Sequence, residues 1–570
     1  METMQILNFL LTTITIAMSI STATSQSSIQ NFINCFSSNS TLSEVIYTPN
    51  NTSFLTILNM KIHNKRFKTA TTPKPSVIIT AKDASHVQAT VICAKRNNIQ
   101  IRIRSGGHDY EGYSYVSDVR FVLLDLSRLN SVDVNVQEET AWVESGATNG
   151  KIYYAIAKKN NSLAFPGGTC FSVGAGGLFS GGGYGNLMRK FGLSIDNIID
   201  ARIVDVSGNI LDRKSMGEDL FWAIRGGGGA SFGIILSWKI KLVQVPQQVT
   251  VFNVKRTVKD GAADIAYKWQ LVAPKFDKDL FIRAHHEVVR IGKQSKKEVQ
   301  VSFIGLFLGT IDRLLPLVSD SFPELGLKKT DCFSMPWVNS TLFSYLKPIG
   351  TPLEALLDEP KNPKPVYAKS KSDYVKKPIP KEAIESLWKL MIEGEDIIYI
   401  QWNPYGGRME EILSSETPFP HRAGNLYMIG YFYGWTEDSL EANEFHVNLA
   451  RSIYEFMTPY VSNSPRETYI NYRDADIGFN KQSNVTEMNI ARTYGAIFFK
   501  GNFERLVSVK TKVDPENFFR YEQSIPTNSS TNVKDVEEKN TFLTWKWYFG
   551  RFVSNSYDFS LGLSSLHFII

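Results

Sequence analysis

Two hydrophobic periodicities follow one another in the first part of the chain. Val87, Val91 and Ala94 recur at helical spacing and predict one apolar face of a helix. Residues 99–104 then alternate between isoleucine and polar side chains, which predicts a half-buried strand. This strand runs into a turn at Ser105–Gly107. The region therefore begins with a helix followed by a strand.

Further apolar runs in this region predict four more strands. They are Phe121–Leu126, Ala141–Glu144, Ile203–Val206 and Ile234–Val243. Residues 150–159 have helical character. Short strands with helical connections predict a mixed α+β domain over residues 26–246.

The middle of the chain, residues 247–466, alternates strand-like and helical segments. The predicted strands include Phe281–Val289, Gln300–Leu308, Ile397–Trp402 and Leu426–Trp435. A helical stripe predicts one core-facing helix surface, made of Phe445, Leu449, Ser452, Ile453 and Phe456. We expect a second domain with an antiparallel sheet capped by helices.

Composition allows two hydrophobic cores, because the chain has 570 residues of which 43% are apolar. The net charge of +6 comes from 62 basic and 56 acidic residues. No basic run is long enough to predict nucleic-acid binding, so we interpret the mild basicity as a solubility property. We expect no metal site.

The first 25 residues have the pattern of a secretory signal peptide. Residues 6–20 are apolar, and Ala23 and Ser25 stand where a signal peptidase prefers small residues. The segment before them has Glu2 and no Lys or Arg, which is atypical. A membrane anchor is the alternative, but the stretch is short and interrupted by threonine and serine. We expect secretion to the apoplast or delivery to the vacuole, without a membrane span.

Glycosylation signals agree with that prediction. Asn-x-Ser/Thr sequons suit a secreted glycoprotein and occur at Asn39, Asn50, Asn51, Asn160, Asn339, Asn484 and Asn528. The chain has four cysteines, at Cys35, Cys93, Cys170 and Cys332.

His108 and Cys170 each follow a double-glycine turn. The turns read Arg-Ser-Gly-Gly-His at 104–108 and Pro-Gly-Gly-Thr-Cys at 166–170. Glycine lets a backbone approach a flat ligand closely, because no Cβ stands in the way. A lone histidine or cysteine is usually structural. Two of them in such turns, followed by a third glycine-rich stretch at 174–185, indicate a ligand site.

With these motifs the chain resembles the berberine bridge enzyme-like family of plant secreted flavoproteins, which includes the cannabinoid synthases. The resemblance runs from about Cys35 to Pro526 and includes residues 181–185, 217–229 and 471–474. It implies a two-domain α+β FAD-binding fold of the PCMH and vanillyl-alcohol-oxidase type, with an antiparallel-sheet substrate domain. It also implies that residues 467–526 return to complete the FAD domain.

The resemblance implies FAD bonded at two points, His108 to the 8α-methyl carbon and Cys170 to C6. It further implies a Cys35–Cys93 disulfide, which suits an oxidising compartment and leaves Cys332 unassigned. Val173 matches the position that gates the approach of oxygen to the flavin. The other residues expected to contact FAD are Ser105, Gly106, Gly107, Gly176, Gly177, Gly181 and Tyr184.

A Rossmann dinucleotide fingerprint is excluded by its spacing. The third glycine would fall on Phe179 in one glycine-rich stretch and on Ser231 in the other. We interpret the glycines as loops that wrap a flat, phosphate-bearing ligand with backbone amides, although a simple turn is the alternative at 226–229. Tyr110, Tyr113 and Tyr115 either pack in the loop after His108 or line the ligand.

Two residues are candidates for catalysis. Tyr472 matches the active-site tyrosine of the family, and as a base it requires a neighbouring cation or the flavin field to lower its pKa. The alternative is a core tyrosine. His285 matches a substrate-pocket histidine of cannabinoid synthases, but His286 beside it leaves the assignment open.

Departures from the family pattern bear on the substrate. Compared with the cannabinoid synthases, Asn403 stands in place of a pocket tyrosine and Met428 in place of a pocket glutamate. Other relatives have a lysine at the position of Met428 and a glutamine at that of Gly430. Many members have a histidine where this chain has Leu178. A pocket that has lost polar groups favours a bulky hydrophobic substrate, such as a prenylated phenol, over a sugar.

The leading hypothesis is a secreted, monomeric FAD-dependent oxidase that takes a hydride from a hydrophobic plant metabolite and passes the electrons to O₂. Oxidative cyclisation of the substrate is one form that this reaction can take. The alternative is a flavin-containing pericyclase that guides a cycloaddition without net redox. A binding protein without turnover is a third hypothesis. Residues 527–570 depart from the family pattern, and we assign this tail no function.

The double attachment of FAD is directly testable. Acid-precipitated wild-type protein should stay yellow, and His108→Ala or Cys170→Ala alone should keep some flavin through the other link. The double variant should release all of it. Absorbance of the washed precipitate measures the outcome, and complete loss of flavin from the wild type on denaturation would contradict both assignments.

Overall fold

The computed structural model describes residues 27–38, 44–291, 296–358, 366–394, 397–480 and 487–529. The predicted signal peptide, the tail after residue 529, and the sequons at Asn39 and Asn484 lie outside these ranges. Within them, no helix combines the length and apolar character needed to cross a bilayer.

One four-stranded sheet forms the beginning of the first lobe. Its order is β1-β2-β4-β3, with β2 (Val77–Thr80), β4 (Phe121–Asp125) and β3 (Gln100–Arg104) parallel and β1 (Ile46–Tyr47) antiparallel at the edge. Helix α3 (Ala84–Arg96) packs on it through the predicted apolar face. A disulfide between Cys35 and Cys93 joins this helix to the N-terminal segment, as expected.

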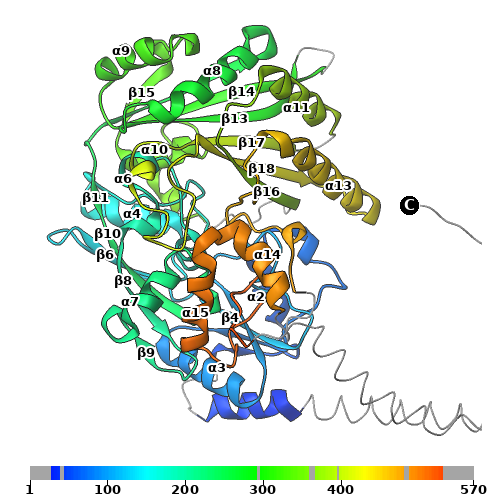
Figure 1. The fold of residues 1–570 in the computed structure, drawn as a ribbon. Helices are drawn as coiled ribbons and strands as arrows, with labels where there is room; N and C mark the ends of the chain where they lie inside the picture. Colours follow the sequence, from blue (N-terminus) through cyan, green and yellow to red (C-terminus); the bar gives the residue numbers. More distant parts are fainter. Residues whose placement is uncertain are drawn as a thin grey trace, which may run out of the picture.

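The second sheet of this lobe is antiparallel, with the order β5-β6-β10-β8-β9. Its strands are β5 (Val132–Asn135), β6 (Thr140–Glu144), β10 (Ile234–Lys241), β8 (Ile198–Val204) and β9 (Ile210–Leu211). Helices α4 (Asn149–Lys159), α5 (Ala175–Gly181) and α7 (Arg213–Ile224) connect them (Figure 1). Two short strands, β11 (Val243–Gln244) and β7 (Leu163–Ala164), pair beside it.

The prediction of a half-buried strand at residues 99–104 is wrong for the arginines. Arg102 and Arg104 are both buried. Arg104 donates to Asp125 at 2.8 Å, and Arg102 donates to Glu522 at 2.7 Å. Alternation indicates which positions share a face, but it cannot show that a distant carboxylate will neutralise the polar face.

The second lobe is a seven-stranded antiparallel sheet with the order β15-β12-β14-β13-β17-β18-β16. The strands are β12 (Val249–Thr257), β13 (Leu280–Ile291), β14 (Lys296–Phe307), β15 (Cys332–Met335), β16 (Tyr367–Val375), β17 (Ile397–Pro404) and β18 (Tyr427–Trp435). Helices α8 (Ala262–Val272), α9 (Ile311–Ser321), α11 (Lys381–Glu393) and α13 (Leu440–Phe456) lie on the side away from the first lobe (Figure 1). The predicted α+β fold with an antiparallel second sheet is confirmed.

Strand alternation separates the two faces of this sheet. Ala284, Trp402 and Ile400 belong to the helix-covered core. His286 shares that face and accepts a hydrogen bond from Trp388 of α11 at 3.1 Å. His285 therefore faces the first lobe, because adjacent residues of a strand point to opposite faces.

The predicted apolar stripe on α13 is displaced by about one residue. Phe445 is 53% exposed, whereas the buried positions are Ala442, His446, Ala450 and Ile453. His446 stacks on Trp435 of β18 with 5.1 Å between ring centroids, so this face of the helix packs on the sheet. A polar residue thus lies in the core while a phenylalanine lies outside it.

The C-terminal segment packs against the first lobe. Helices α14 (Met488–Phe499) and α15 (Phe503–Val513) contribute Phe498, Leu506 and Val507 to the same core cluster as Phe221 of α7. Between the second lobe and α14, this segment passes through Tyr472.

A buried ion cluster joins the two lobes. Lys369 of β16 donates to Glu111 at 2.5 Å and to Asp474 at 2.6 Å, and Lys371 donates to Asp474 at 2.6 Å and to Asp476 at 2.7 Å. Burial opposes the charge on Lys369, but its carboxylate partners outweigh burial and raise its pKa. The cluster holds the loop after His108 and the segment after Tyr472 against one strand.

Removing Lys369 should therefore destabilise the protein. Lys369→Met removes one of the two lysines that neutralise Asp474 and leaves Glu111 with the more distant Arg66, at 3.6 Å. The loss of this buried cation should cost about 3–5 kcal/mol of unfolding free energy. Lys381→Met, which breaks an exposed pair with Asp264, should cost less than about 1 kcal/mol. Thermal unfolding of the two variants in parallel measures the difference, and equal midpoints would contradict the role of the cluster.

His286 should contribute to acid sensitivity. Burial, aided by His285, lowers its pKa to about 3, while an unfolded histidine protonates near its ordinary value. Between these values the unfolded state binds more protons, so stability falls as pH falls. His286→Gln should reduce this slope by about 1.4 kcal/mol per pH unit between about pH 6 and 4. Chemical unfolding at several pH values measures it, and an unchanged slope would refute it.

Candidate functional site

The turn that carries His108 needs its two glycines for packing. A Cβ on Gly106 would lie 2.5 Å from the Gly174 nitrogen, and a Cβ on Gly107 would lie 1.9 Å from the Lys61 carbonyl oxygen. Gly107 also has a φ of +73°, which disfavours any side chain. The end of β3 is thereby pressed between the segment at Lys61 and the third glycine-rich stretch.

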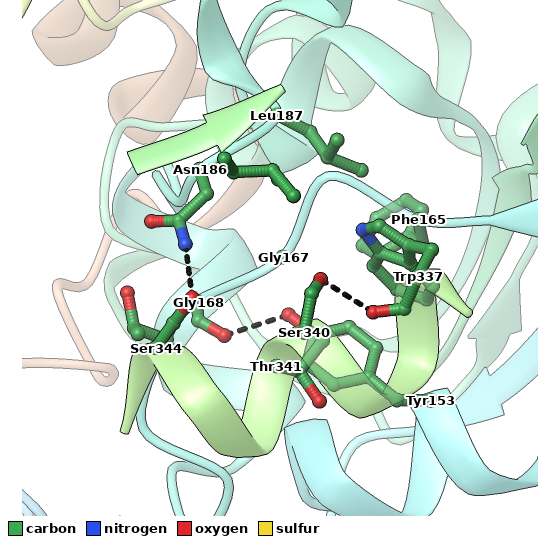
Figure 2. A pocket seen from close by; sticks show the side chains of 12 residues that line it. Tyr153, Phe165, Gly167, Gly168, Asn186, Leu187, Trp337, Ser340, Thr341 and Ser344 are labelled. Carbon is green, nitrogen blue, oxygen red and sulfur yellow. Dashed lines mark hydrogen bonds between the residues drawn. The ribbon is translucent and has the colours of Figure 1, made fainter. Parts of the chain in front are cut away.

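The turn that carries Cys170 is held from behind by two helices. The start of α4 supplies the Asn149 side chain, which donates to the Cys170 carbonyl at 2.9 Å, and Tyr153, whose hydroxyl donates to the Gly168 carbonyl at 2.6 Å. Figure 2 shows α10 (Trp337–Ser344) across the other side of a small cavity of about 20 Å³, with Ser344 accepting from Asn186 at 2.6 Å. This cavity is too small for more than a water-sized ligand.

His108 and Cys170 both contact the side chain of Ser172, which the sequence motifs did not single out. The Ser172 hydroxyl lies 3.1 Å from Nε2 of His108 and 3.4 Å from Sγ of Cys170. Both partners are half-buried. Burial, His63 and Lys61 lower the pKa of His108 well below its ordinary value, and the His63 ring stacks on it at 3.9 Å. His108 is therefore neutral.

The remaining predicted cofactor residues surround these two turns. Ser105 donates to the Ser145 carbonyl at 2.6 Å, and the Gly176 amide donates to the same carbonyl at 2.9 Å. A Cβ on Gly181 would lie 2.1 Å from Oδ1 of Asn471, whereas one on Gly177 would meet nothing within 4 Å. Gly177 thus borders open space, and Val173 is half-buried in the Cys170 turn.

We expected the glycines at 226–229 to offer free backbone amides to a ligand, but the structure shows two of these amides already bonded within the protein. The amides of Gly226 and Gly228 both donate to the Ser180 carbonyl, at 3.1 and 2.9 Å. The segment therefore packs against α5, and these two amides are already satisfied within the protein. The alternative of a structural turn holds for these two residues.

Tyr472 lies in a half-buried group of aromatic side chains from both lobes. Its ring makes edge contacts with Tyr110 at 5.9 Å and with Phe432 of β18 at 5.2 Å. Phe432 in turn stacks on Tyr399 of β17 at 4.8 Å. Tyr472 and Tyr184 share a very short hydroxyl–hydroxyl contact. Burial raises the pKa of Tyr472 well above its ordinary value, the neighbouring Tyr184 and Tyr110 hydroxyls raise it further, and Arg283 opposes the rise.

A hydrogen-bonded chain leads from Arg283 to Tyr472. Arg283 of β13 donates to Oδ1 of Asn403 at 2.6 Å, and the Asn403 amide donates to the Tyr184 hydroxyl at 3.5 Å. The side chain of Arg283 is buried, and no carboxylate of the described residues lies within ion-pair distance of it. Sequence reasoning anticipated a cation near Tyr472 but did not identify Arg283.

The loop tyrosines after His108 have different roles. Tyr110 contacts Tyr472, whereas Tyr115 is 1% exposed and packs on Phe67. Arg473 lies over the ring of Tyr113 at 5.9 Å. Of the three, Tyr110 borders the aromatic group and Tyr115 is a core residue.

His285 is on the face of the sheet that Arg283 and Gln401 share. Its Nδ1 lies 3.3 Å from the Gln401 amide, and its ring lies 5.1 Å from that of Tyr399. Burial and Arg283 lower the pKa of His285 to about 4. A neutral imidazole at this place can hydrogen-bond but does not serve as a ready acid at neutral pH.

Two of the substituted pocket positions are not open to a ligand. Asn403 is fully buried by its contacts with Arg283 and Tyr184, and Met428 is 2% exposed in the main core cluster. The match to pocket positions of relatives therefore does not make them exposed here, because Met428 packs in the core and Asn403 is held between Arg283 and Tyr184. Gly430 does face the site, since a Cβ there would lie 3.0 Å from the Tyr472 ring. Leu178 borders Gly168 and Gly183.

This arrangement suits FAD. Two nucleophilic side chains 62 positions apart converge on one hydroxyl. Gly177 leaves open space beside the turns, and half-buried aromatic rings provide a wall for a flat ring system.

Comparison with known proteins agrees with the cofactor. A family model described as FAD binding domain matches residues 75–213, and one described as berberine and berberine like matches residues 468–526. Berberine bridge enzyme-like 3 of Arabidopsis thaliana is 51% identical over 512 residues, covering 89% of this chain and 95% of that protein.

Two solved structures are similar over nearly their whole length. An isoleucine-to-valine variant of the grass pollen allergen Phl p 4, described as a glucose oxidase, is 41% identical with a TM-score of 0.81; the similarity covers 87% of this chain and 99% of that chain. A variant of berberine bridge enzyme in complex with (S)-reticuline is 35% identical with a TM-score of 0.80, covering 88% and 99%. The chain therefore belongs to the berberine bridge enzyme-like family of FAD-linked oxidoreductases.

Proposed function

We propose that the protein is a secreted FAD-dependent oxidase that takes a hydride from a hydrophobic, phenol-like plant metabolite, with Tyr472 as base and O₂ as acceptor. Bound FAD, held by His108 and Cys170, supplies the two-electron acceptor. The observation that carries the proposal is the hydrogen-bond chain that joins the buried Arg283 to Tyr472.

The chain supports a tyrosinate at Tyr472. Arg283 donates to Asn403 and Asn403 donates to Tyr184, whereas either hydroxyl of the Tyr184–Tyr472 contact can donate. Once Tyr472 loses its proton, the Tyr184 hydroxyl is the donor to it. A buried cation without a carboxylate partner favours an anion nearby. Hydrogen bonds to the charged form lower a pKa and so offset part of the burial that raises it. Tyr472 can then accept a proton while a hydride leaves the substrate.

The aromatic group supports a flat, apolar substrate. Tyr110, Tyr399 and Phe432 offer ring faces and edges beside Tyr472, and such surfaces bind aromatic ligands well. Gly430 lets the Tyr472 and Phe432 rings pack closely against the strand, since a Cβ there would lie within 3.0 Å of both. His285, neutral and bonded to Gln401, can hydrogen-bond a polar end of the substrate. A prenylated phenol combines these features.

O₂ as acceptor is supported by Val173. The resemblance assigns this half-buried position to the gating of oxygen, and a small side chain there leaves access. In the related Phl p 4, a change of isoleucine to valine accompanies glucose oxidase activity, whereas the wild type is a glucose dehydrogenase. Secretion is supported by the Cys35–Cys93 disulfide and by exposed sequons at Asn50, Asn51 and Asn528.

The proposal predicts the behaviour of a base variant. Tyr472→Phe should keep its FAD but lose about 10²–10⁴-fold in the rate of flavin reduction by prenylated phenols, because general base catalysis contributes that much. Tyr267→Phe, on the exposed side of α8, should behave as wild type. Anaerobic stopped-flow absorbance measures the rate, and aerobic turnover should release hydrogen peroxide and a product lighter by two hydrogens.

Arg283→Met completes this test. Losing the cation should move the alkaline rise of kcat/KM to higher pH, since deprotonated Tyr472 is then less stable. Wild-type flavin that no phenolic donor reduces would contradict the oxidase proposal. A product whose mass is the sum of two substrates would indicate cycloaddition instead.

A further inference from the structure

Ser172 lies between the two residues that are proposed to carry the flavin. We infer that Ser172 is a positioning residue for flavin attachment, and that its single hydroxyl prepares both His108 and Cys170 to bond the ring. The inference rests on the proposed double attachment and goes beyond it, because the reaction of the substrate uses neither contact.

The place of Ser172 is fixed by the backbone around it. The Asn149 amide donates to the Val173 carbonyl at 3.0 Å, and the Gly150 amide donates to the Phe171 carbonyl at 2.9 Å. The Asn149 side chain donates to the Cys170 carbonyl at 2.9 Å. These bonds hold the turn on both sides of Ser172, so its contacts with His108 and Cys170 are properties of the turn.

We place the hydrogen of His108 on Nε2, the nitrogen that faces Ser172. A neutral imidazole carries one hydrogen and one lone pair. Nε2 lies 3.1 Å from the Ser172 hydroxyl, which can accept that hydrogen. With hydrogen on Nε2, the lone pair lies on Nδ1, and that nitrogen is the nucleophile.

The same hydroxyl then activates Cys170. Because Ser172 accepts from Nε2, its own hydrogen is available to the sulfur 3.4 Å away. A hydrogen bond donated to the sulfur stabilises the negative charge on it as it attacks the ring. In the reverse orientation, Ser172 donates to Nε2 and the thiol donates to Ser172, and neither Nδ1 nor the sulfur is activated. Tyr345, 3.8 Å from the sulfur, acts on the Cys170 side alone.

Each attachment has the same balance. One C–H of the flavin and one N–H or S–H of the protein are replaced by a C–N or C–S bond. The two hydrogens leave as two protons and two electrons. O₂ takes up all four to form hydrogen peroxide. Ser172 is placed to accept the proton that His108 loses at Nε2.

The test compares variants of Ser172 in full-length protein. Protein produced under riboflavin limitation is mixed with FAD in air, and the peptides that contain His108 and Cys170 are followed by mass for attached flavin. Ser172→Ala should slow attachment at both residues about tenfold, the effect of losing one hydrogen bond of about 1.4 kcal/mol. The same slowing is expected in the His108→Ala and Cys170→Ala backgrounds, at the link that remains.

A matched pair separates the hydroxyl from its volume. Ser172→Thr should attach flavin at nearly the wild-type rate, and Ser172→Val, which is almost equal in size, should be as slow as Ser172→Ala. Noncovalent FAD binding and thermal stability should be similar in the pair. Equal rates for the pair, or slowing at only one of the two links, would overturn the shared role. Wild-type protein that never attaches flavin would overturn the double attachment itself, whereas normal attachment in Ser172→Ala would overturn only this inference.

Discussion

The docking of the second lobe on the first depends on buried charge. Lys369 and Lys371 project from one strand of the antiparallel sheet and are neutralised by Glu111 and Asp474 of the first lobe and the C-terminal segment. Glu111 follows His108 by three positions, and Asp474 follows Tyr472 by two. Because isolated buried ions are costly, this cluster permits one alignment of three chain segments. The residues proposed to attach the cofactor, to act as base and to line the substrate all depend on that alignment.

A second buried charge has a different purpose. Arg283 lies in the same interface but has amide and hydroxyl partners instead of a carboxylate. Hydrogen bonds through Asn403 and Tyr184 connect Arg283 to Tyr472. The lysines of the ion cluster are neutralised by carboxylates, and we assign the cluster a structural role. Arg283 has no such partner among the described residues, so its charge remains available to stabilise an anion at the site.

Local sequence patterns were sufficient for the parts of the site that are built by consecutive residues. The glycine turns of His108 and Cys170 show in the sequence because a close backbone approach needs glycine at fixed spacing. Long-range partners leave no such pattern. A half-buried strand at residues 99–104 implies an exposed polar face, yet Arg102 is buried with Glu522, which lies 420 positions away. Asn403 and Met428 match pocket positions of relatives, but contacts with other segments bury both side chains. Periodicity indicated the α+β class and the family resemblance indicated the FAD-binding fold, whereas the hydrogen-bond chain from Arg283 required coordinates.

The proposed mechanism depends on Arg283 lowering the pKa of Tyr472 through the hydrogen-bond chain when FAD is bound. Selective ¹³C labelling of tyrosine at Cζ, with Tyr472→Phe to assign the signal, measures the ionisation of Tyr472 by NMR. We expect Tyr472 to titrate at lower pH in the FAD-loaded wild type than in FAD-loaded Arg283→Met, because the buried cation stabilises the tyrosinate. Equal titration points in the two proteins, or a higher one in the wild type, would contradict this dependence.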